Sequence, residues 1–289
     1  MPIAALCAAI TAATGERFAA PRVRRAAGGD VSEAQLLDDG RRRFFVKLQT
    51  ASRRDLFAAE ADGLAALGAH LRVPGVIVTG IAEGRAYLVL EALDLAATGD
   101  AAALGVALAA LHRAPQARFG WTRDNWIGAT PQPNAWRDDW LAFWRTQRLG
   151  FQLDLAARNG HGGALQHDGE YLLAHLEGLF YGYTPAPSLL HGDLWGGNHG
   201  YLPDGNPVLF DPAVYVGDRE ADLAMSELFG GYAPDFYAAY CAAWPLDSGY
   251  PTRKILYNLY HILNHANLFG GGYAAQAARM AALLVAELK

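Results

Sequence analysis

The alternation of hydrophobic and polar residues divides the chain into two parts with different periodicity. In the first 92 residues, short β-branched and aromatic runs predict strands, and the turn residues of Leu37–Gly40 predict a hairpin between two of them. The helical spacing of Phe57, Leu64 and Leu67 predicts a helix that interrupts the sheet. The predicted strands lie within Arg22–Lys47 and at Val76–Val78 and Ala86–Leu90, and the predicted helices are Ile3–Ala13 and Arg53–Leu71.

From residue 93 onward the apolar residues recur mainly at helical spacing. Between Ser188 and Asp211, short apolar runs instead flank turns rich in Gly, Pro, Asp and Asn. The pattern predicts an α+β fold, with a small antiparallel β lobe with one helix over residues 1–92 and a larger, mainly helical lobe over 93–289. The helices predicted in the second part are Ala101–Arg113, Trp136–Asn159, Gly169–Tyr181, Asp235–Trp244, Arg253–Phe269 and Tyr273–Lys289.

The densest group of candidate catalytic residues is the run His-Gly-Asp-Leu-Trp-Gly-Gly-Asn at 191–198, followed by a predicted hairpin over 199–210. A hairpin returns its second strand to the start of its first, so we expect Asn198 and Asp211 to be neighbours, with Asp193 on the same loop. Asp193 suits a base that accepts the proton of an attacking hydroxyl. Asn198 and Asp211 suit oxygen ligands of Mg²⁺, as phosphoryl transfer requires.

Each of these residues alone also fits a turn, and Asp211-Pro212 could simply cap a helix. Their combined spacing and the predicted hairpin favour a catalytic role for the group as a whole. Asp222 shares a helical face with Met225 and Phe229, which predicts a buried carboxylate. Such a carboxylate needs donors, which the backbone amides of the His-Gly-Asp turn would supply. A solvent-exposed position at a helix end is the alternative for Asp222.

A lysine and a glutamate form a second candidate group far upstream. Alternation places Lys47 on the strand face opposite to Phe44 and Val46. Glu60 lies on the apolar stripe of the following helix, where a carboxylate is costly unless it is paired. Lys47 is its natural partner, and the pair could hold an ammonium against nucleotide phosphates. The alternative is that Glu60 flanks the stripe and stays solvated.

Two further segments are candidates for contacts with a nucleotide. Gly28 and Gly29 fall in a predicted strand–turn–strand, where glycines allow backbone amides to approach phosphate, although two glycines also suit an ordinary turn. Glu91, Ala92 and Leu93 end the last strand of the first part. Their backbone could hydrogen-bond an adenine.

Three aromatic side chains are candidates for the substrate site. Trp195 lies beside the proposed base and could stack on a sugar, or it could close the core beneath the loop. His261 and His265 are one helical turn apart, a spacing that can bind a metal, but no third ligand is evident. Structural, hydrogen-bonded roles are the better interpretation for both, and with Asn258 they form a polar stripe that could line a substrate pocket.

Composition narrows the class of protein. The chain has 289 residues and a net charge of −5 with mixed signs, unlike the basic stripe of a nucleic-acid binder. Cys7 and Cys241 lie far apart, which argues against a disulfide framework and fits a reducing cytoplasm. The N-terminal residues lack the basic region of a signal peptide, and no apolar run could span a bilayer. We expect a cytoplasmic protein, monomeric or weakly dimeric, without nucleic-acid or membrane partners.

These parts in this order resemble the protein-kinase-like fold. More narrowly, they resemble the fructosamine kinase (ketosamine-3-kinase) family, which is related to aminoglycoside phosphotransferases. The resemblance covers nearly the whole chain. The motifs that carry it are His191–Asn198, Phe210–Ala213, Gly217–Met225, Phe119–Trp121, Asp124-Asn125, Thr130–Gln132, Leu256–His261 and Asn264-His265.

The resemblance implies a kinase that uses ATP and Mg²⁺. The implied substrate is a ketosamine such as a ribulosamine or fructosamine adduct, phosphorylated on the third carbon. The phosphorylated adduct is unstable and frees the amine, which implies deglycation. The implied roles are catalytic base for Asp193, Mg²⁺ ligands for Asn198 and Asp211, phosphate positioning for Lys47 and Glu60, adenine contact for Glu91–Leu93, and structural support for His191 and Asp222.

One departure and two alternatives remain. The family often has a cysteine in the glycine-rich loop where this chain has Asp30, so redox control through that loop is not expected. The chain could be a kinase of another small molecule, such as an aminoglycoside, choline or a different sugar, or a non-catalytic nucleotide-binding scaffold. The run 211–231 argues against the first, and the intact candidate residues argue against the second. A protein kinase is disfavoured because Asp211-Pro212-Ala213 replaces Asp-Phe-Gly.

Overall fold

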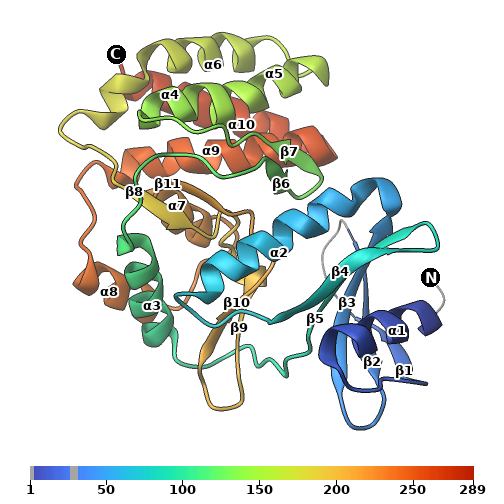
Figure 1. The fold of residues 1–289 in the computed structure, drawn as a ribbon. Coiled ribbons are helices and arrows are strands. Elements are labelled where there is room, and N and C mark those ends of the chain that lie inside the picture. Colours follow the sequence, from blue (N-terminus) through green and yellow to red (C-terminus); the bar gives the residue numbers. More distant parts are fainter. Residues whose placement is uncertain (1–2, 27–31) are drawn as a thin grey trace. The chain divides into compact units, whose positions relative to one another are not determined.

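The computed structural model describes residues 3–26 and 32–289, and their contacts divide the chain into two compact units (Figure 1). The first unit comprises the residues up to Asp100 together with 199–212, and the second comprises 101–198 and 213–289. This division differs from the expected boundary at residue 92. The difference arises because the 199–212 hairpin joins the first unit, where Tyr201 pairs with Ala96 and the Leu209 amide donates to the Arg72 carbonyl.

A five-stranded antiparallel sheet of order β1-β2-β3-β5-β4 forms the centre of the first unit. The predicted hairpin turn joins β2 to β3, and the Asp38 carboxylate accepts the Gly40 amide at 2.8 Å where the Gly40 φ is +86°. The elements of this unit are α1 (Ile3–Thr14), β1 (Arg22–Arg25), β2 (Glu33–Asp38), β3 (Arg43–Thr50), α2 (Arg54–Gly68), β4 (Val76–Ala82), β5 (Arg85–Glu91), β9 (His199–Tyr201) and β10 (Pro207–Leu209).

The side chains of β3 alternate between the two faces of the sheet, as predicted. Phe44, Val46 and Leu48 join Leu6 and Ile10 of α1 in one buried cluster. Lys47 points to the other face, where it meets α2. Alternation therefore carries a lysine into the interior beside a helix while its neighbours build the core.

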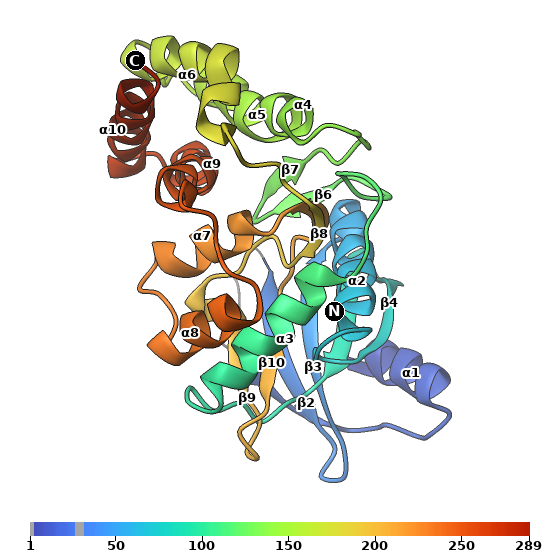
Figure 2. The same cartoon turned by 90° about the vertical axis from the view of Figure 1, so that its left-hand side faces the viewer.

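The second unit is mainly helical, as predicted (Figure 2). Its central helix α9 contacts both α7 and α10, while α3 packs against α8. Two short antiparallel pairs, β8 with β11 and β6 with β7, accompany the helices. The elements are α3 (Ala101–Arg113), β6 (Asn125–Ile127), β7 (Thr130–Gln132), α4 (Trp140–Trp144), α5 (Gly150–Arg158), α6 (Ala164–His175), β8 (Pro187–Leu190), β11 (Tyr215–Asp218), α7 (Glu220–Leu228), α8 (Pro234–Ala243), α9 (Tyr250–Phe269) and α10 (Gly272–Glu287).

The helix predicted over Trp136–Asn159 differs from the observed segment in two respects. It begins only at Trp140, because the Asp139 carboxylate caps it by accepting the Ala142 amide at 2.6 Å. A π-helical turn, Arg145–Leu149, then separates α4 from α5. A Cβ on Gly150 would lie 2.3 Å from the Arg145 carbonyl oxygen, so this wide turn requires glycine.

The other predicted helices agree within a few residues, except around Gly169–Tyr181. There α6 begins earlier, at Ala164, and a 3₁₀ segment, Leu176–Phe180, follows it. The strands β6, β7 and β11 were not predicted, because three or four residues are too few to show a period.

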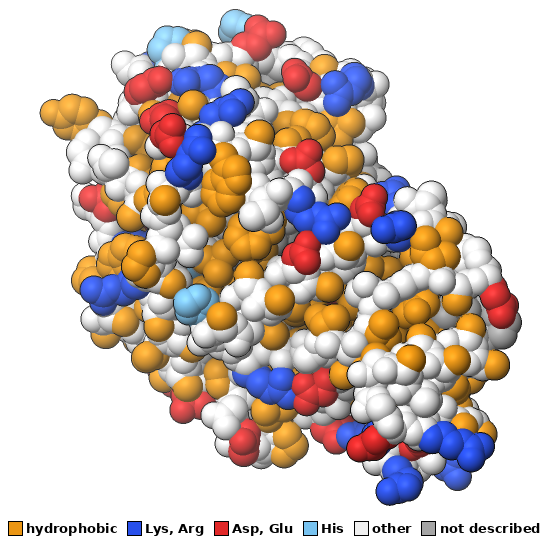
Figure 3. Space-filling model, viewed as in Figure 1, with side chains coloured by type: hydrophobic (Ala, Val, Ile, Leu, Met, Phe, Trp, Pro, Cys, Tyr) orange, Lys and Arg blue, Asp and Glu red, His pale blue; other side chains and the backbone are white. Residues whose placement is uncertain are grey.

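Charged side chains of both signs are interspersed on the face drawn in Figure 3, in keeping with a sequence that has similar numbers of basic and acidic residues and a net charge of −5. Among residues 3–26 and 32–289, no helix combines the length and apolar character needed to cross a bilayer.

Candidate active site

The loop after β8 carries Asp193, and its own residues hold this side chain in place. The Asn198 amide nitrogen donates to the Asp193 carbonyl at 2.9 Å and to Asp193 Oδ2 at 3.1 Å. The Asp193 amide donates to Nδ1 of the buried His191 at 3.3 Å, so that ring carries its proton on Nε2. Hydrogen bonds therefore hold both the main chain and the carboxylate of the predicted base, and Asn198 lies beside it.

Asp222 anchors the start of this loop from α7. Its two carboxylate oxygens accept the His191 amide at 2.7 Å and the Gly192 amide at 2.8 Å, as predicted for a buried carboxylate. The side chain of His112 lies 3.2 Å from the same carboxylate and bonds Tyr240 at 2.8 Å. Burial alone would raise the pKa of Asp222, but the His112 and amide hydrogen bonds outweigh it and lower the pKa.

The loop geometry also depends on glycine at position 192. Gly192 has φ +81°, and a Cβ there would lie 2.0 Å from the Ala213 carbonyl oxygen. The Ala213 amide donates to the His191 carbonyl at 2.9 Å, so the two segments are in close backbone contact. A side chain at this position would separate them.

In the first unit, Lys47 forms the predicted ion pair with Glu60. The distance from Lys47 Nζ to Glu60 Oε1 is 2.6 Å, and Nζ also lies 2.5 Å from Asp211 Oδ1. Lys47 and Glu60 are 8% and 9% exposed, so the solvated alternative for Glu60 is wrong. Burial alone would lower the pKa of Lys47, but the two carboxylates raise it above its ordinary value and keep the ammonium charged.

Asp211 follows the predicted hairpin, whose strands pair with His199 opposite Leu209. Its φ of 55° lies in the left-handed region, which is unusual for a residue other than glycine and is concentrated at functional positions. The carboxylate of Asp211 and the amide oxygen of Asn198 are hard oxygen donors, the type that Mg²⁺ takes. Both residues therefore have the chemistry of magnesium ligands, and the expected proximity of the two remains a prediction.

The residues predicted to contact a nucleotide base lie at the end of β5. The Glu91 carboxylate bonds the Arg72 guanidinium at 2.5 Å and the Gly75 amide at 3.1 Å. Its side chain is thus engaged within the first unit, and the contact of this segment's backbone with adenine remains a prediction. Ala92 and Leu93 continue as irregular chain. Gly28, Gly29 and Asp30 lie outside the described residues.

The aromatic candidates lie close together in the second unit. Trp195 is 39% exposed, and its ring meets Phe229 edge-on at 6.4 Å. The ring of His265 contacts Phe229 at 5.0 Å, and its Nδ1 bonds the His261 carbonyl at 2.8 Å. No cluster of three or more His, Cys, Asp or Glu suited to a metal occurs within the described ranges.

Sequence reasoning missed His112, whose only signal was a histidine on the apolar stripe of α3, in line with Leu104 and Leu108. It also missed an amide cluster behind the loop. The Gln132 amide donates to the Ala213 carbonyl at 3.1 Å, and the Asn125 amide donates to the Val214 carbonyl at 2.7 Å. Both residues lie in motifs that carry the family resemblance, but the spacing of the motifs does not reveal which backbone carbonyl each side chain binds.

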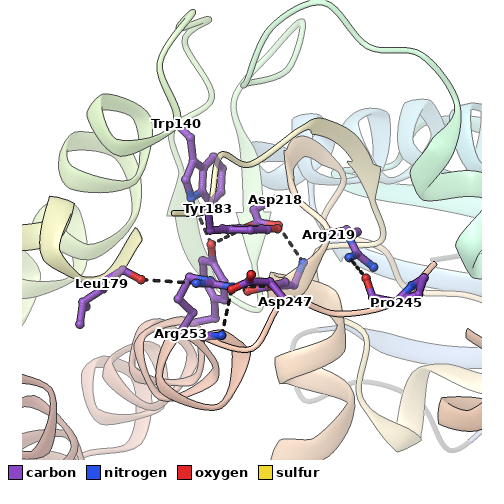
Figure 4. Close-up of polar contacts among 11 residues, drawn as sticks. Trp140, Leu179, Tyr183, Asp218, Arg219, Pro245, Asp247 and Arg253 are labelled. Atoms are coloured by element: carbon purple, nitrogen blue, oxygen red, sulfur yellow. Dashed lines mark hydrogen bonds and ion pairs between the residues drawn. The ribbon is translucent and has the colours of Figure 1, made fainter. Parts of the chain in front are cut away.

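A buried charged network holds the beginning of α7 (Figure 4). Arg253 makes two hydrogen bonds to Glu220, at 2.7 and 3.0 Å, and its guanidinium stacks over the Tyr183 ring at 3.8 Å. Asp218 accepts the hydroxyls of Tyr183 and Tyr257 at 2.9 and 2.5 Å, and it also accepts the Glu220 amide. These contacts fix the helix that carries Asp222.

Known proteins resemble this chain along almost its whole length. A family model described as fructosamine kinase matches residues 2–287. The chain is 47% identical over 276 residues to a probable ketoamine kinase of Synechocystis, covering 94% of this chain and 92% of that protein. It is 40% identical over 256 residues to a chloroplastic protein-ribulosamine 3-kinase of Arabidopsis thaliana, covering 86% and 78%.

Solved structures agree with the predicted fold class. A candidate fructosamine-3-kinase from Haemophilus somnus superposes with a TM-score of 0.88 at 29% identity, covering 97% of this chain and 96% of that one. An aminoglycoside phosphotransferase, in complex with ADP and hygromycin B, has a TM-score of 0.65 at 15% identity and covers 98% of each chain, a likeness of fold alone. The protein-kinase-like α+β fold is thereby confirmed, and the chain belongs to the fructosamine kinase family.

Proposed function

We propose that this protein phosphorylates the 3-hydroxyl of a ketosamine, such as a ribulosamine or fructosamine adduct, with ATP as the phosphoryl donor. The observation that carries the proposal is the double anchoring of Asp193, by Asn198 on its carboxylate and by Asp222 through the preceding amides. The names of the relatives support the substrate class, because they are ketoamine and ribulosamine kinases at 40–47% identity.

In this mechanism, the oxygen of the substrate hydroxyl bonds to the γ-phosphorus of ATP, and Asp193 accepts the proton of that hydroxyl. The bond between the γ-phosphorus and the oxygen that leaves with ADP breaks. Lys47, held by Glu60, would neutralise charge on the phosphates. Asn198 and Asp211 would hold Mg²⁺, which when bound supplies charge neutralisation at the transferred phosphoryl group. We assign the adenine contact to the backbone of Glu91–Leu93 and a phosphate contact to Gly28 and Gly29.

The sugar would be bound near Trp195, whose exposed ring can stack on an apolar sugar face. His261 and His265 are proposed to line the same side of the substrate site. Phosphorylation at the third carbon would labilise the adduct and release the free amine, so the proposed biological outcome is deglycation.

Magnesium-dependent ADP release tests this function, with the ribulosamine and the fructosamine of lysine as acceptors and Asp193→Asn as control. Stimulation by either adduct, lost in the variant, is the expected result. If aminoglycosides or choline stimulate turnover and ketosamines do not, the substrate class is wrong. If nucleotide binds but no acceptor stimulates turnover, the scaffold alternative replaces the enzyme.

A further inference from the structure

Asn258 on α9 has a buried amide oxygen without a hydrogen-bond partner. The residue is 7% exposed, and its Oδ1 receives no donor from any residue that the structure describes. A buried carbonyl oxygen that receives no donor destabilises the folded state, because it has lost its hydrogen bonds to water. In native proteins such a group calls for an explanation, such as an ordered water, an ion or a functional role.

The position of Asn258 on α9 places it toward the end of α7. One turn earlier, Lys254 bonds Glu227 of α7 at 2.7 Å. Two turns later, the His265 ring contacts Phe229, directly after α7. Because helical residues advance by about 100°, these two positions and Asn258 lie on one face, so Asn258 faces the same segment.

This segment also borders the loop of the proposed base. The Phe229 ring meets the half-exposed ring of Trp195, two residues after Asp193. A Cβ on Gly196 would lie 3.9 Å from the Gly231 carbonyl oxygen, so the backbone beyond Phe229 also lies against this loop. The face of α9 that carries Asn258 is thus connected to Trp195 through Phe229.

Lys254 and His261, which lie near Asn258 on this face, present no unpaired positive charge to an incoming donor. Burial, with smaller effects of His265 and Arg148, lowers the pKa of His261 to about 3, so its ring is neutral near pH 7. The Lys254 ammonium is paired with Glu227. An N–H group arriving beside the Asn258 oxygen would therefore meet an acceptor and a neutral imidazole.

We propose that Asn258 accepts an N–H from the protonated secondary amine of the ketosamine and thereby distinguishes a ketosamine from its parent ketose. This inference rests on the proposed function. The amine is the chemical group that separates the two sugars, and at neutral pH it is a cation with two N–H donors. The amide oxygen offers it a charge-assisted hydrogen bond inside a buried setting.

Steady-state kinetics with fructosamine-lysine and with the matching 1-deoxyketose, which lacks the amine, test the assignment. In Asn258→Leu we expect the KM for the ketosamine to rise about tenfold, as for loss of a hydrogen bond to a charged group. The inhibition constant of the 1-deoxyketose should stay within twofold. Asn258→Asp keeps the side-chain shape and adds an acceptor charge, so its KM should equal or fall below that of the wild type.

Asn264→Leu provides a matched control, because Asn264 is buried on the same helix and its oxygen accepts from Gln152 at 3.3 Å. This variant should change the KM for the ketosamine and the inhibition constant of the 1-deoxyketose by the same factor. The inference is overturned if Asn258→Leu leaves the ketosamine KM unchanged, if it shifts both constants equally, or if Asn258→Asp is as impaired as Asn258→Leu. Absence of turnover with any ketosamine in the wild type would instead refute the proposed function itself, before any variant is compared.

Discussion

His112 on α3 lies with its Nε2 atom 3.2 Å from Oδ2 of Asp222 on α7, and both side chains are almost completely buried. Because the carboxylate can only accept, His112 donates through Nε2 and accepts the Tyr240 hydroxyl at Nδ1. The imidazole therefore orients the carboxylate that holds the loop of Asp193, although it lies far from that loop in the sequence.

The first prediction concerns Asp222 itself. Asp222→Asn replaces one acceptor oxygen with a donor facing a backbone amide, so we expect a loss of about 1–3 kcal/mol in the free energy of unfolding. We also expect kcat to fall at least tenfold, since the loop loses its anchor. Urea unfolding and initial rates measure the two effects. Asp154→Asn, at an exposed position on α5, is the control and should change neither; equal behaviour of the two variants would contradict the anchoring role.

The second prediction concerns the close contact at Gly192. Gly192→Ala combines a left-handed φ with a Cβ 2.0 Å from the Ala213 carbonyl oxygen, so the loop must move and activity should fall at least 100-fold. Gly182→Ala is the matched control, because its φ is +76° but no atom lies within 4 Å of the added Cβ. That variant should lose only about 1 kcal/mol of stability and keep its activity. Comparable rates in both variants would show that the contact does not matter.

The third prediction concerns the buried ion pair. Lys47→Met leaves the Glu60 and Asp211 carboxylates without their shared ammonium, so the free energy of unfolding should fall by about 3–5 kcal/mol. Glu60→Gln keeps the contact between Lys47 and Asp211 and should cost less. Denaturant unfolding of both variants at pH 7 measures the difference. A larger loss in Glu60→Gln would mean that Lys47 does not hold the two carboxylates together.

The fourth prediction concerns pH and His261. Its pKa falls from an ordinary 6.5 to about 3 on folding, so between these values the unfolded chain binds the additional proton. Stability must therefore decrease as the pH falls below 6.5, by about 2 kcal/mol from this residue at pH 5. His261→Gln should lose about that much less stability than the wild type between pH 7 and pH 5.

Chemical denaturation at the two pH values measures this difference. His70→Gln, an exposed position after α2, is the control and should follow the wild type. If His261→Gln and the wild type lose the same stability on acidification, the imidazole of His261 is protonated in the folded protein and the burial argument is wrong.

The periodicity of the chain was sufficient to predict most helices and the antiparallel sheet. It also predicted the interaction partners of two buried carboxylates. Lys47 and Glu60 could be paired because alternation and the apolar stripe each placed a charge in the interior, where it needs a counter-charge. Asp222 could be assigned to the amides before Asp193 for the same reason. These predictions succeeded because burial follows from local pattern, and a buried charge restricts its partners.

Only the tertiary structure decided which distant groups complete these contacts. It placed His112 against Asp222, Gln132 against the Ala213 carbonyl and Arg253 against Glu220, and it joined the 199–212 hairpin to the first unit. Neutral donors and backbone acceptors have many equivalent partners in a sequence of this length. Which of them meet depends on how helices from different parts of the chain pack, and the spacing of residues along the chain does not encode that choice.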